Sequence, residues 1–181
     1  MKRALLLFLV GFVCSFAHAQ SLSVKSNMLL LGTGSPNMGL EFGIGKKYSL
    51  SLDASYNPFK FSELTFWKHV AVQPEFRWWL CHRYAGSFLG THALYSHFNV
   101  SAPSLGLDYR YQGDLAGAGV AYGYSWMLGK RWNIEAVIGG GFVHLRYDKY
   151  ECKECGDRLG TYKRNYLGVT KAAISLIYHI K

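Results

Sequence analysis

Residues 38–57 read MGLEFGIGKKYSLSLDASYN, and this stretch decides the fold. On both sides of a Gly-Lys-Lys turn the residues alternate between two faces, and a period of two is typical of a β-strand. One face is apolar and includes Leu40, Phe42 and Leu50, whereas the other carries glycine, serine and the acids Glu41 and Asp53. Such a pair of faces suits a narrow barrel with a polar inside and an outside that contacts lipid.

The first 19 residues are predicted to be a removable Sec-type signal peptide, which leaves residues 20–181 as one barrel domain. Two basic residues precede an apolar run over residues 4–16, which is too short to cross a bilayer as a helix. Residues 17–19 read AHA and fit the small-x-small cleavage rule. A lipoprotein signal ending at Cys14 is the alternative, but a valine precedes this cysteine where a small residue is needed.

The excess of basic residues indicates which kinds of partner the protein can bind. The chain carries 20 Lys and Arg against 11 Asp and Glu, a formal net charge of +9. For an exported protein with dispersed charge, this excess favours anionic lipid, lipopolysaccharide or another polysaccharide as partner, and not nucleic acid. Aromatic residues make up 16% of the chain and 20 residues are glycine, a combination that favours many strands joined by tight turns.

Alternation along the rest of the chain predicts eight strands. They cover residues 22–31, 38–45, 47–57, 69–80, 87–99, 114–128, 132–147 and 163–180. Short turns and long loops alternate between them, as in barrels with short periplasmic turns and longer extracellular loops. We therefore predict an all-β fold, an eight-stranded antiparallel up-and-down transmembrane β-barrel of the outer-membrane type, located in the outer membrane.

Aromatic residues support this orientation of the faces. Tyr48, Trp78, Trp126, Trp132 and Tyr178 all fall on the apolar face near a short turn or the end of the chain. This placement predicts an aromatic belt at one membrane interface. The alternative is a soluble barrel of the lipocalin type that carries a small ligand, but its strands would expose their many glycines to water without any gain in packing.

Short blocks of sequence also carry a resemblance. They read KSN at 25–27, PNMGLE at 36–41, YNP at 56–58, PEFRWW at 74–79, GTHA at 90–93, AYGY at 121–124, WNIE at 132–135 and GGGF at 139–142. In this order they resemble the domain-of-unknown-function 3575 family of Bacteroidetes cell-envelope proteins, over essentially the whole mature chain. The resemblance implies an outer-membrane β-barrel and brings no catalytic residues. Association of such proteins with fimbrial or adhesin gene clusters implies a surface-associated role.

The first candidate site consists of the charged residues that alternation places on the inner face of the barrel. They are Lys25, Glu41, Asp53, Glu75, Arg77, Glu135 and Lys171. An eight-stranded barrel has room for side chains but not for an aqueous channel, and charges buried there must pair. We interpret the set as a salt-bridge plug with Arg77 at its centre, flanked by Glu75 and partnered by Glu41 or a lysine. A proton relay or gated pore is the alternative.

Three cysteines remain after signal cleavage. The predicted topology separates Cys81 from the other two by the thickness of the membrane, which is too far for a disulfide. Cys152 and Cys155 lie in the last long loop, and we expect them to form a small disulfide in an oxidising compartment. Half of a zinc site is the second interpretation, but the loop offers no histidine of its own. Thioredoxin-like redox catalysis is the third, but the helix start and βαβ context that it needs are absent. We predict no metal and no cofactor.

Two further groups bear on function. Ser96, His97 and His144 fall near the outer ends of strands and could serve a lipid A-modifying hydrolase, but no G-x-S-x-G motif is present. Interleaved aromatic and basic residues in the long loops suit sugars, phosphates or a partner protein. The candidates for such binding are Tyr109, Arg110, Tyr111, Tyr150, Lys153 and Arg158. The sequence thus predicts a non-enzymatic envelope protein with a structural or surface-interaction role.

Overall fold

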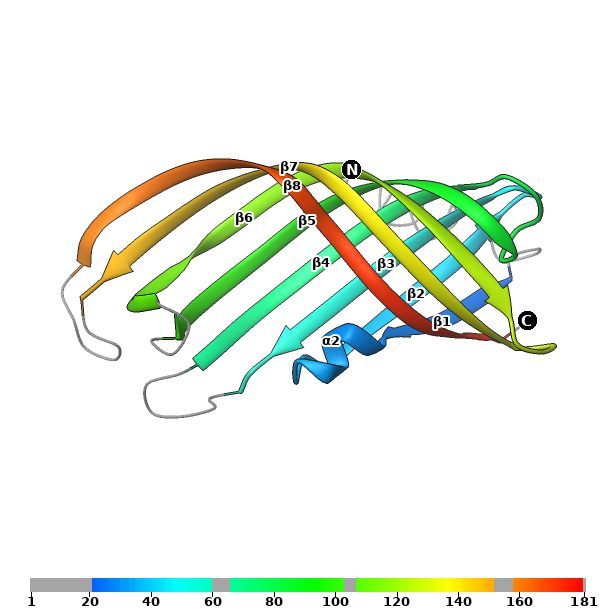
Figure 1. Ribbon diagram of the computed structural model, residues 1–181, viewed down its shortest axis with the longest axis horizontal. Coiled ribbons are helices and arrows are strands. Elements are labelled where there is room, and N and C mark those ends of the chain that lie inside the picture. The colour runs from blue at the N-terminus through cyan, green and yellow to red at the C-terminus, as the bar shows by residue number, and fades with distance from the viewer. Residues whose placement is uncertain (1–20, 60–65, 103–106, 152–157, 181) are drawn as a thin grey trace, which may run out of the picture.

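A computed structural model describes residues 21–59, 66–102, 107–151 and 158–180. Its eight strands form one antiparallel up-and-down sheet, and β1 pairs with β8 to close the barrel (Figure 1). The elements are β1 (Leu22–Asn27), α2 (Met28–Gly32), β2 (Asn37–Ile44), β3 (Tyr48–Asn57), β4 (Phe66–Trp79), β5 (Gly86–Ala102), β6 (Leu107–Met127), β7 (Trp132–Tyr150) and β8 (Arg158–His179). The predicted eight-stranded antiparallel barrel is confirmed.

The prediction is wrong at the end of the first strand. Instead of continuing to residue 31, β1 ends at Asn27 and the short helix α2 follows. The Asn27 side chain starts this helix, because its Oδ1 accepts a hydrogen bond from the backbone N–H of Leu29 at 3.0 Å. Within the described ranges, no helix is both long and apolar enough to cross a membrane.

The barrel has a polar inside and an apolar outside. In β4, Glu75, Arg77 and Trp79 are buried, while Phe76 and Trp78 between them are exposed on the outer face. The other buried polar side chains of the strands include Ser23, Lys25, Glu41, Ser49, Ser51, His92, Ser96, Ser125, Asn133, Glu135, Lys171 and Ser175. This is the reverse of the arrangement in a lipocalin-type barrel, in which the apolar face points inward.

The predicted row of outer aromatic residues encircles the end of the barrel that carries the short turns. Tyr48 pairs in register with Trp78, and Trp132 pairs with Tyr178. The rings of Trp132 and Tyr178 have their centroids 4.9 Å apart, and Trp126 is about half exposed, at 47%. These side chains thus form one band of large aromatic groups on the outer face.

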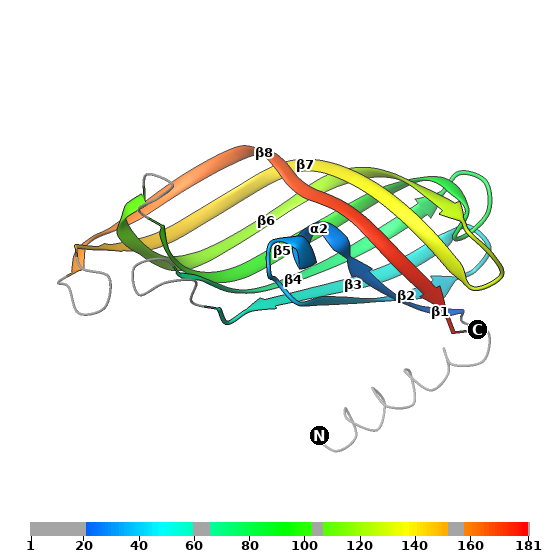
Figure 2. The ribbon, with the colours of Figure 1, turned by 60° about the horizontal axis from the view of Figure 1, so that its bottom comes forward.

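Strand lengths are very unequal around the barrel. β1 has 6 residues, β2 has 8 and β3 has 10, whereas β6 has 21, β7 has 19 and β8 has 22. Figures 1 and 2 show the result, because β6, β7 and β8 extend to the left well beyond the ends of the short strands. We call residues 98–102, 107–115, 145–150 and 158–164 the extended wall. Much of this wall was predicted to be loop, and that prediction is wrong.

A β-bulge lies next to the glycine run at residues 139–141. In β7 the alternation of buried and exposed residues continues through these glycines. The extra residue is Thr170 of β8, because Gly139 pairs with Lys171 and Gly140 pairs with Val169. Both Thr170 and Lys171 consequently reach the lumen, and the Thr170 hydroxyl lies 2.8 Å from Nε2 of His92.

The close approach of β6 and β7 at Gly141 can be tested by substitution. A Cβ on Gly141 would overlap the backbone of Ala118 and Gly119, whereas a Cβ on Gly32 meets nothing within 4 Å. Gly141→Ala is expected to lower the free energy of unfolding by about 1–3 kcal/mol, measured by chemical denaturation. Gly32→Ala is the control and should leave the midpoint close to that of the wild type. Equal midpoints for all three proteins would contradict the prediction.

Candidate functional site: a buried charge network and a tyrosine-lined wall

The seven inward charges lie together in the lumen and form one continuous network. They come from six strands: β1, β2, β3, β4, β7 and β8. Their side chains are buried, except that Asp53 is 26% exposed toward a cavity above it. The structure therefore brings together all seven charged residues that the alternation assigns to the inner face.

Arg77 lies at the centre of the network. Its Nη1 donates to Glu41 at 2.9 Å and to Glu135 at 2.7 Å, and its Nη2 donates to the other oxygen of Glu135 at 3.0 Å. Its Nε donates to Glu75 at 2.7 Å. The guanidinium also lies over the ring of Phe88, with 4.4 Å from Cζ to the ring centroid. One cation thus holds three carboxylates from three different strands, a geometry that only the planar fork of arginine provides.

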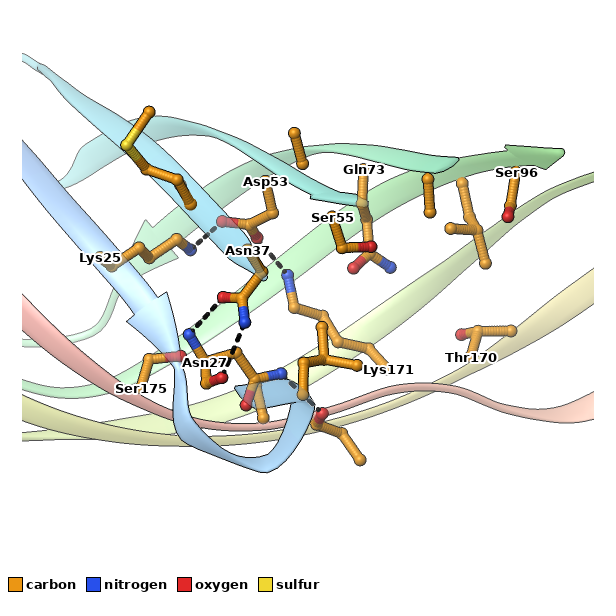
Figure 3. A pocket seen from close by; sticks show the side chains of 18 of the residues that line it. Lys25, Asn27, Asn37, Asp53, Ser55, Gln73, Ser96, Thr170, Lys171 and Ser175 are labelled. Atoms are coloured by element: carbon orange, nitrogen blue, oxygen red, sulfur yellow. Dashed lines mark hydrogen bonds and ion pairs between the residues drawn. The ribbon is translucent and has the colours of Figure 1, made fainter. Parts of the chain in front are cut away.

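Two lysines extend the network toward the taller end. Lys171 donates to Glu75 at 2.9 Å and to Asp53 at 3.0 Å. Lys25 lies 3.0 Å from the other oxygen of Asp53, so Asp53 joins the two ammonium groups, as Figure 3 shows. Glu75 in turn connects this pair of lysines with Arg77. Loss of the Asp53 carboxylate would break the ion pairs of both lysines with it, in a region shielded from water.

Glycines on the inner face make room for these long side chains. A Cβ on Gly39 would overlap the Asp53 carboxylate and the Lys25 chain. A Cβ on Gly90 would lie 2.5 Å from Oε1 of Glu75. The unusual glycine-and-acid face of the sequence therefore has a steric cause, because each large charged group occupies the space that a neighbouring strand leaves empty.

Aromatic side chains close the lumen below the network, at the end with the short turns. Trp79 and Phe88 are fully buried, with ring centroids 4.6 Å apart, and the Trp79 indole donates to Ser49 at 2.8 Å. Ser49 donates to Glu41 at 2.6 Å and so joins this layer to the network. Tyr84, from the turn between β4 and β5, packs against Trp79 from below. Sequence reasoning missed this layer, although Trp79 and Ser49 both fall on the inward phase.

The inner face of the extended wall carries a row of tyrosines. Tyr111 of β6, Tyr147 of β7 and Tyr162 of β8 lie side by side, with 5.7 Å between successive ring centroids. They line an open cavity of about 650 Å³ together with Phe98 and Val100 of β5. Three other residues of this lining are basic: Lys149, Lys163 and Arg164. The surface is thus concave, aromatic and positively charged.

Most of the predicted outer binding residues belong to this wall or its rim, but on strands and not in loops. Lys149 lies over the ring of Tyr109 at 3.5 Å, and Arg110 lies over Tyr150 at 5.3 Å. Arg158 begins β8, where it forms an ion pair with Asp148 at 3.4 Å. The loop prediction failed because both faces of these strand ends are polar or aromatic, which hides the alternation of an apolar face. Lys153 lies outside the described residues.

The three residues considered for hydrolysis, Ser96, His97 and His144, do not share one face of the barrel. Ser96 is buried on the inner face, while its neighbour His97 points outward and bonds to Asp114 at 2.8 Å. His144 is also exposed, and its Nδ1 lies 2.7 Å from the Asn165 side chain. The Ser96 hydroxyl and the His97 imidazole therefore point to opposite faces of β5.

The cysteines and the candidate metal ligands are the last groups singled out by the sequence. Among the described residues, no three His, Cys, Asp or Glu side chains are grouped as metal ligands. Cys81 is exposed and free in the turn after β4. Cys152 and Cys155 lie outside the described residues, and their predicted disulfide stays a prediction.

The central role of Arg77 can be tested by substitution. Arg77→Met leaves Glu41, Glu75 and Glu135 without their shared cation, and removal of one partner of a buried ion pair costs about 3–5 kcal/mol. We expect a correspondingly lower free energy of unfolding in denaturant titrations. Lys46→Met, at an exposed turn position, is the control and should have no measurable effect. An Arg77→Met protein as stable as the control would contradict a structural role for the network.

Comparison with known proteins agrees with the resemblance drawn from the short sequence blocks. No curated protein and no solved structure matches the chain. The family model described as "Protein of unknown function (DUF3575)" matches residues 5–180, which is nearly the whole sequence. The chain therefore belongs to the DUF3575 family.

Proposed function

We propose that this protein is a non-enzymatic outer-membrane β-barrel with a structural and surface-interaction role in the cell envelope. Its placement in a membrane rests on the inverted polarity of the barrel. Large apolar side chains such as Leu50, Leu52 and Ile138 are exposed on the outer face, at 44%, 46% and 63%. A continuous apolar outside with a charged inside is unfavourable in water and favourable in lipid. The aromatic row then lies at the periplasmic interface.

Fractionation tests this location directly. The full-length protein is expected in the outer-membrane fraction after export. In SDS gels, the purified protein should migrate faster without heating than after boiling, because a closed barrel resists unfolding by the detergent. Its signal peptide should be absent by intact-mass measurement. Recovery of a folded barrel from the soluble periplasmic fraction would overturn the membrane placement.

The extended wall supports the surface-interaction role. A strand crosses the hydrocarbon region with about 9–11 residues, so strands of 19–22 residues extend well beyond it. This extension carries the tyrosine row and the basic lining described above. Aromatic faces suit sugar rings, and lysine and arginine suit phosphate or carboxylate groups. We infer that the wall contacts anionic glycan of the envelope, such as the core sugars of lipopolysaccharide, or a glycan-bearing partner at the cell surface.

Substitution of the central tyrosine tests this role. Tyr147 touches both Tyr111 and Tyr162, so Tyr147→Ala should disrupt the whole row. We expect the variant to bind immobilised lipopolysaccharide about tenfold more weakly than the wild type, as measured by surface plasmon resonance. Tyr56→Ala is the matched control, because Tyr56 is exposed on the outer face of the short strand β3. Equal affinity of the two variants would remove the wall as the contact surface.

A further inference from the structure

The barrel wall is incomplete between β1 and β8. β1 pairs with β8 only from Ser23 to Asn27, opposite His179 to Ser175. β8 continues for 17 residues beyond this paired region, from Ile174 back to Arg158. Six residues of β1 are fewer than the 9–11 or so that a strand needs to cross the hydrocarbon region. In the proposed membrane orientation, the outer part of this wall is therefore not closed by strand pairing.

The helix α2 lies against β8 where β1 stops. Asn27 holds the junction, because its Nδ2 donates to the carbonyl of Ala172 at 3.3 Å and its Oδ1 accepts from the N–H of Ile174 at 3.3 Å. The carbonyl groups of Leu29, Leu30 and Leu31 accept hydrogen bonds from the N–H groups of residues 33–35, so part of the α2 backbone is satisfied within this segment. Figure 2 shows α2 in front of the barrel, below β8. We call the contact between α2 and β8 the seam.

The two central leucines of α2 lie on opposite sides of the seam. Leu29 is 47% exposed and lies in an outward groove with Ala172 and Ile174. Leu30 lines a cavity inside the lumen. α2 is therefore a thin, apolar partition between the outer surface and the lumen. α2 is only five residues long, and the hydrogen bonds of Asn27 with Ala172 and Ile174 hold its start against β8.

The cavity behind the seam has a volume of about 310 Å³ and an amphipathic lining (Figure 3). Its floor is the part of the charge network formed by Lys25, Asp53 and Lys171. The larger apolar side chains of the lining come from α2 and from β2, β5 and β6, and they are Leu30, Met38, Leu94 and Leu115. The polar lining above the floor includes Ser55, His69, Gln73, Ser96 and Thr170. A volume of this size is at the lower end of small-ligand sites.

Two polar groups of the lining lack partners. Nε2 of Gln73 and Nδ1 of His69 are buried and make no hydrogen bond with any described residue. His69 and Gln73 are four residues apart on β4, so both side chains point to the inner face. The Ser55 hydroxyl lies 3.4 Å from the other ring nitrogen of His69, Nε2. A buried donor without a partner is unfavourable by about 1–3 kcal/mol. Both groups are suited to an acceptor oxygen supplied by a ligand.

We propose that the cavity binds the oxygen-bearing end of a single long-chain fatty acyl ligand, which enters from the membrane through the seam. The carboxyl or carbonyl oxygen accepts hydrogen bonds from Gln73 and His69, after small rotations of their side chains. The acyl chain passes Leu30 and extends outward past Leu29 into the lipid. This inference depends on the proposed membrane placement but not on glycan binding by the extended wall.

Photo-crosslinking tests the proposal on the full-length protein in lipid nanodiscs. The probe is a palmitic acid with a diazirine close to its carboxyl group, and mass spectrometry locates the labelled residues. Labelling is expected on the lumenal lining of β4, β5 and β6, with competition by unlabelled palmitic acid. A parallel competition with palmitoyl lysophosphatidylethanolamine distinguishes a free fatty acid from a lysolipid as the source of the acyl group. Labelling of outward-facing residues alone would show annular lipid only and would overturn the proposal.

Two variants of α2 provide a matched pair. Leu30→Trp fills the cavity behind the seam and should reduce lumenal labelling about tenfold, because the bulky ring takes the space of the ligand. Leu31→Trp places the same side chain at a 42% exposed position of the same helix and should label like the wild type. Gln73→Leu should weaken competition by palmitic acid about tenfold through loss of one hydrogen bond. Equal labelling of the two tryptophan variants would overturn entry through the seam.

Control measurements separate acyl binding in the cavity from the membrane placement and from glycan binding by the extended wall. Heat-modifiable migration of each variant shows that the barrel has formed, so a folding defect is not read as a loss of binding. Failure of the membrane placement would appear in fractionation of the wild type. Failure of glycan binding would leave the labelling pattern unchanged. Absence of saturable lumenal labelling in a folded, membrane-inserted wild type therefore contradicts this inference alone.

Discussion

The rest of the structure depends on the pairing of Arg77 with three buried carboxylates. A guanidinium shielded from water is tolerated only when its donors are satisfied, and Glu41, Glu75 and Glu135 satisfy them from three strands. This requirement fixes which residues of β2, β4 and β7 lie at the same height, and so it fixes the register of the barrel. A slip of one residue in any of these strands would turn its carboxylate to the outer face.

The network also divides the lumen into two parts with different properties. Below it, Trp79 and Phe88 fill the space as a small apolar core, and Tyr84 closes the end. Above it, the lumen widens into the cavity behind α2 and then into the concave extended wall. Because side chains occupy the centre of the barrel, the interior is suited to stability and the upper surfaces to contact with ligands. The unequal strand lengths are what expose those surfaces.

The sequence predicted the members of the charge network but not the tyrosine row of the extended wall, and each outcome has its own physical reason. The seven network charges could be selected because strict alternation assigns each residue to a face, and charges on an inner face have to pair. Glu135 was not singled out as a partner of Arg77, because alternation assigns a residue to the inner face but does not say which residue of β7 lies opposite Arg77 across the lumen. Tyr111 and Tyr162 of the tyrosine row were assigned to loops, since strand ends with polar or aromatic residues on both faces show no apolar alternation.

The sequence by itself determined the number and order of strands, the polarity of the two faces and the membership of the charge network. These properties follow from local alternation, which depends only on the geometry of extended backbone. Only the tertiary structure decided the pairing of Arg77 with Glu135 across the lumen and the bulge at Thr170, which both depend on contacts between strands. It also placed α2 after Asn27, whose side chain bonds both to the start of α2 and to β8. Closure of the barrel, and not any local pattern, brings Tyr111, Tyr147 and Tyr162 into one row and places Leu30 over the cavity.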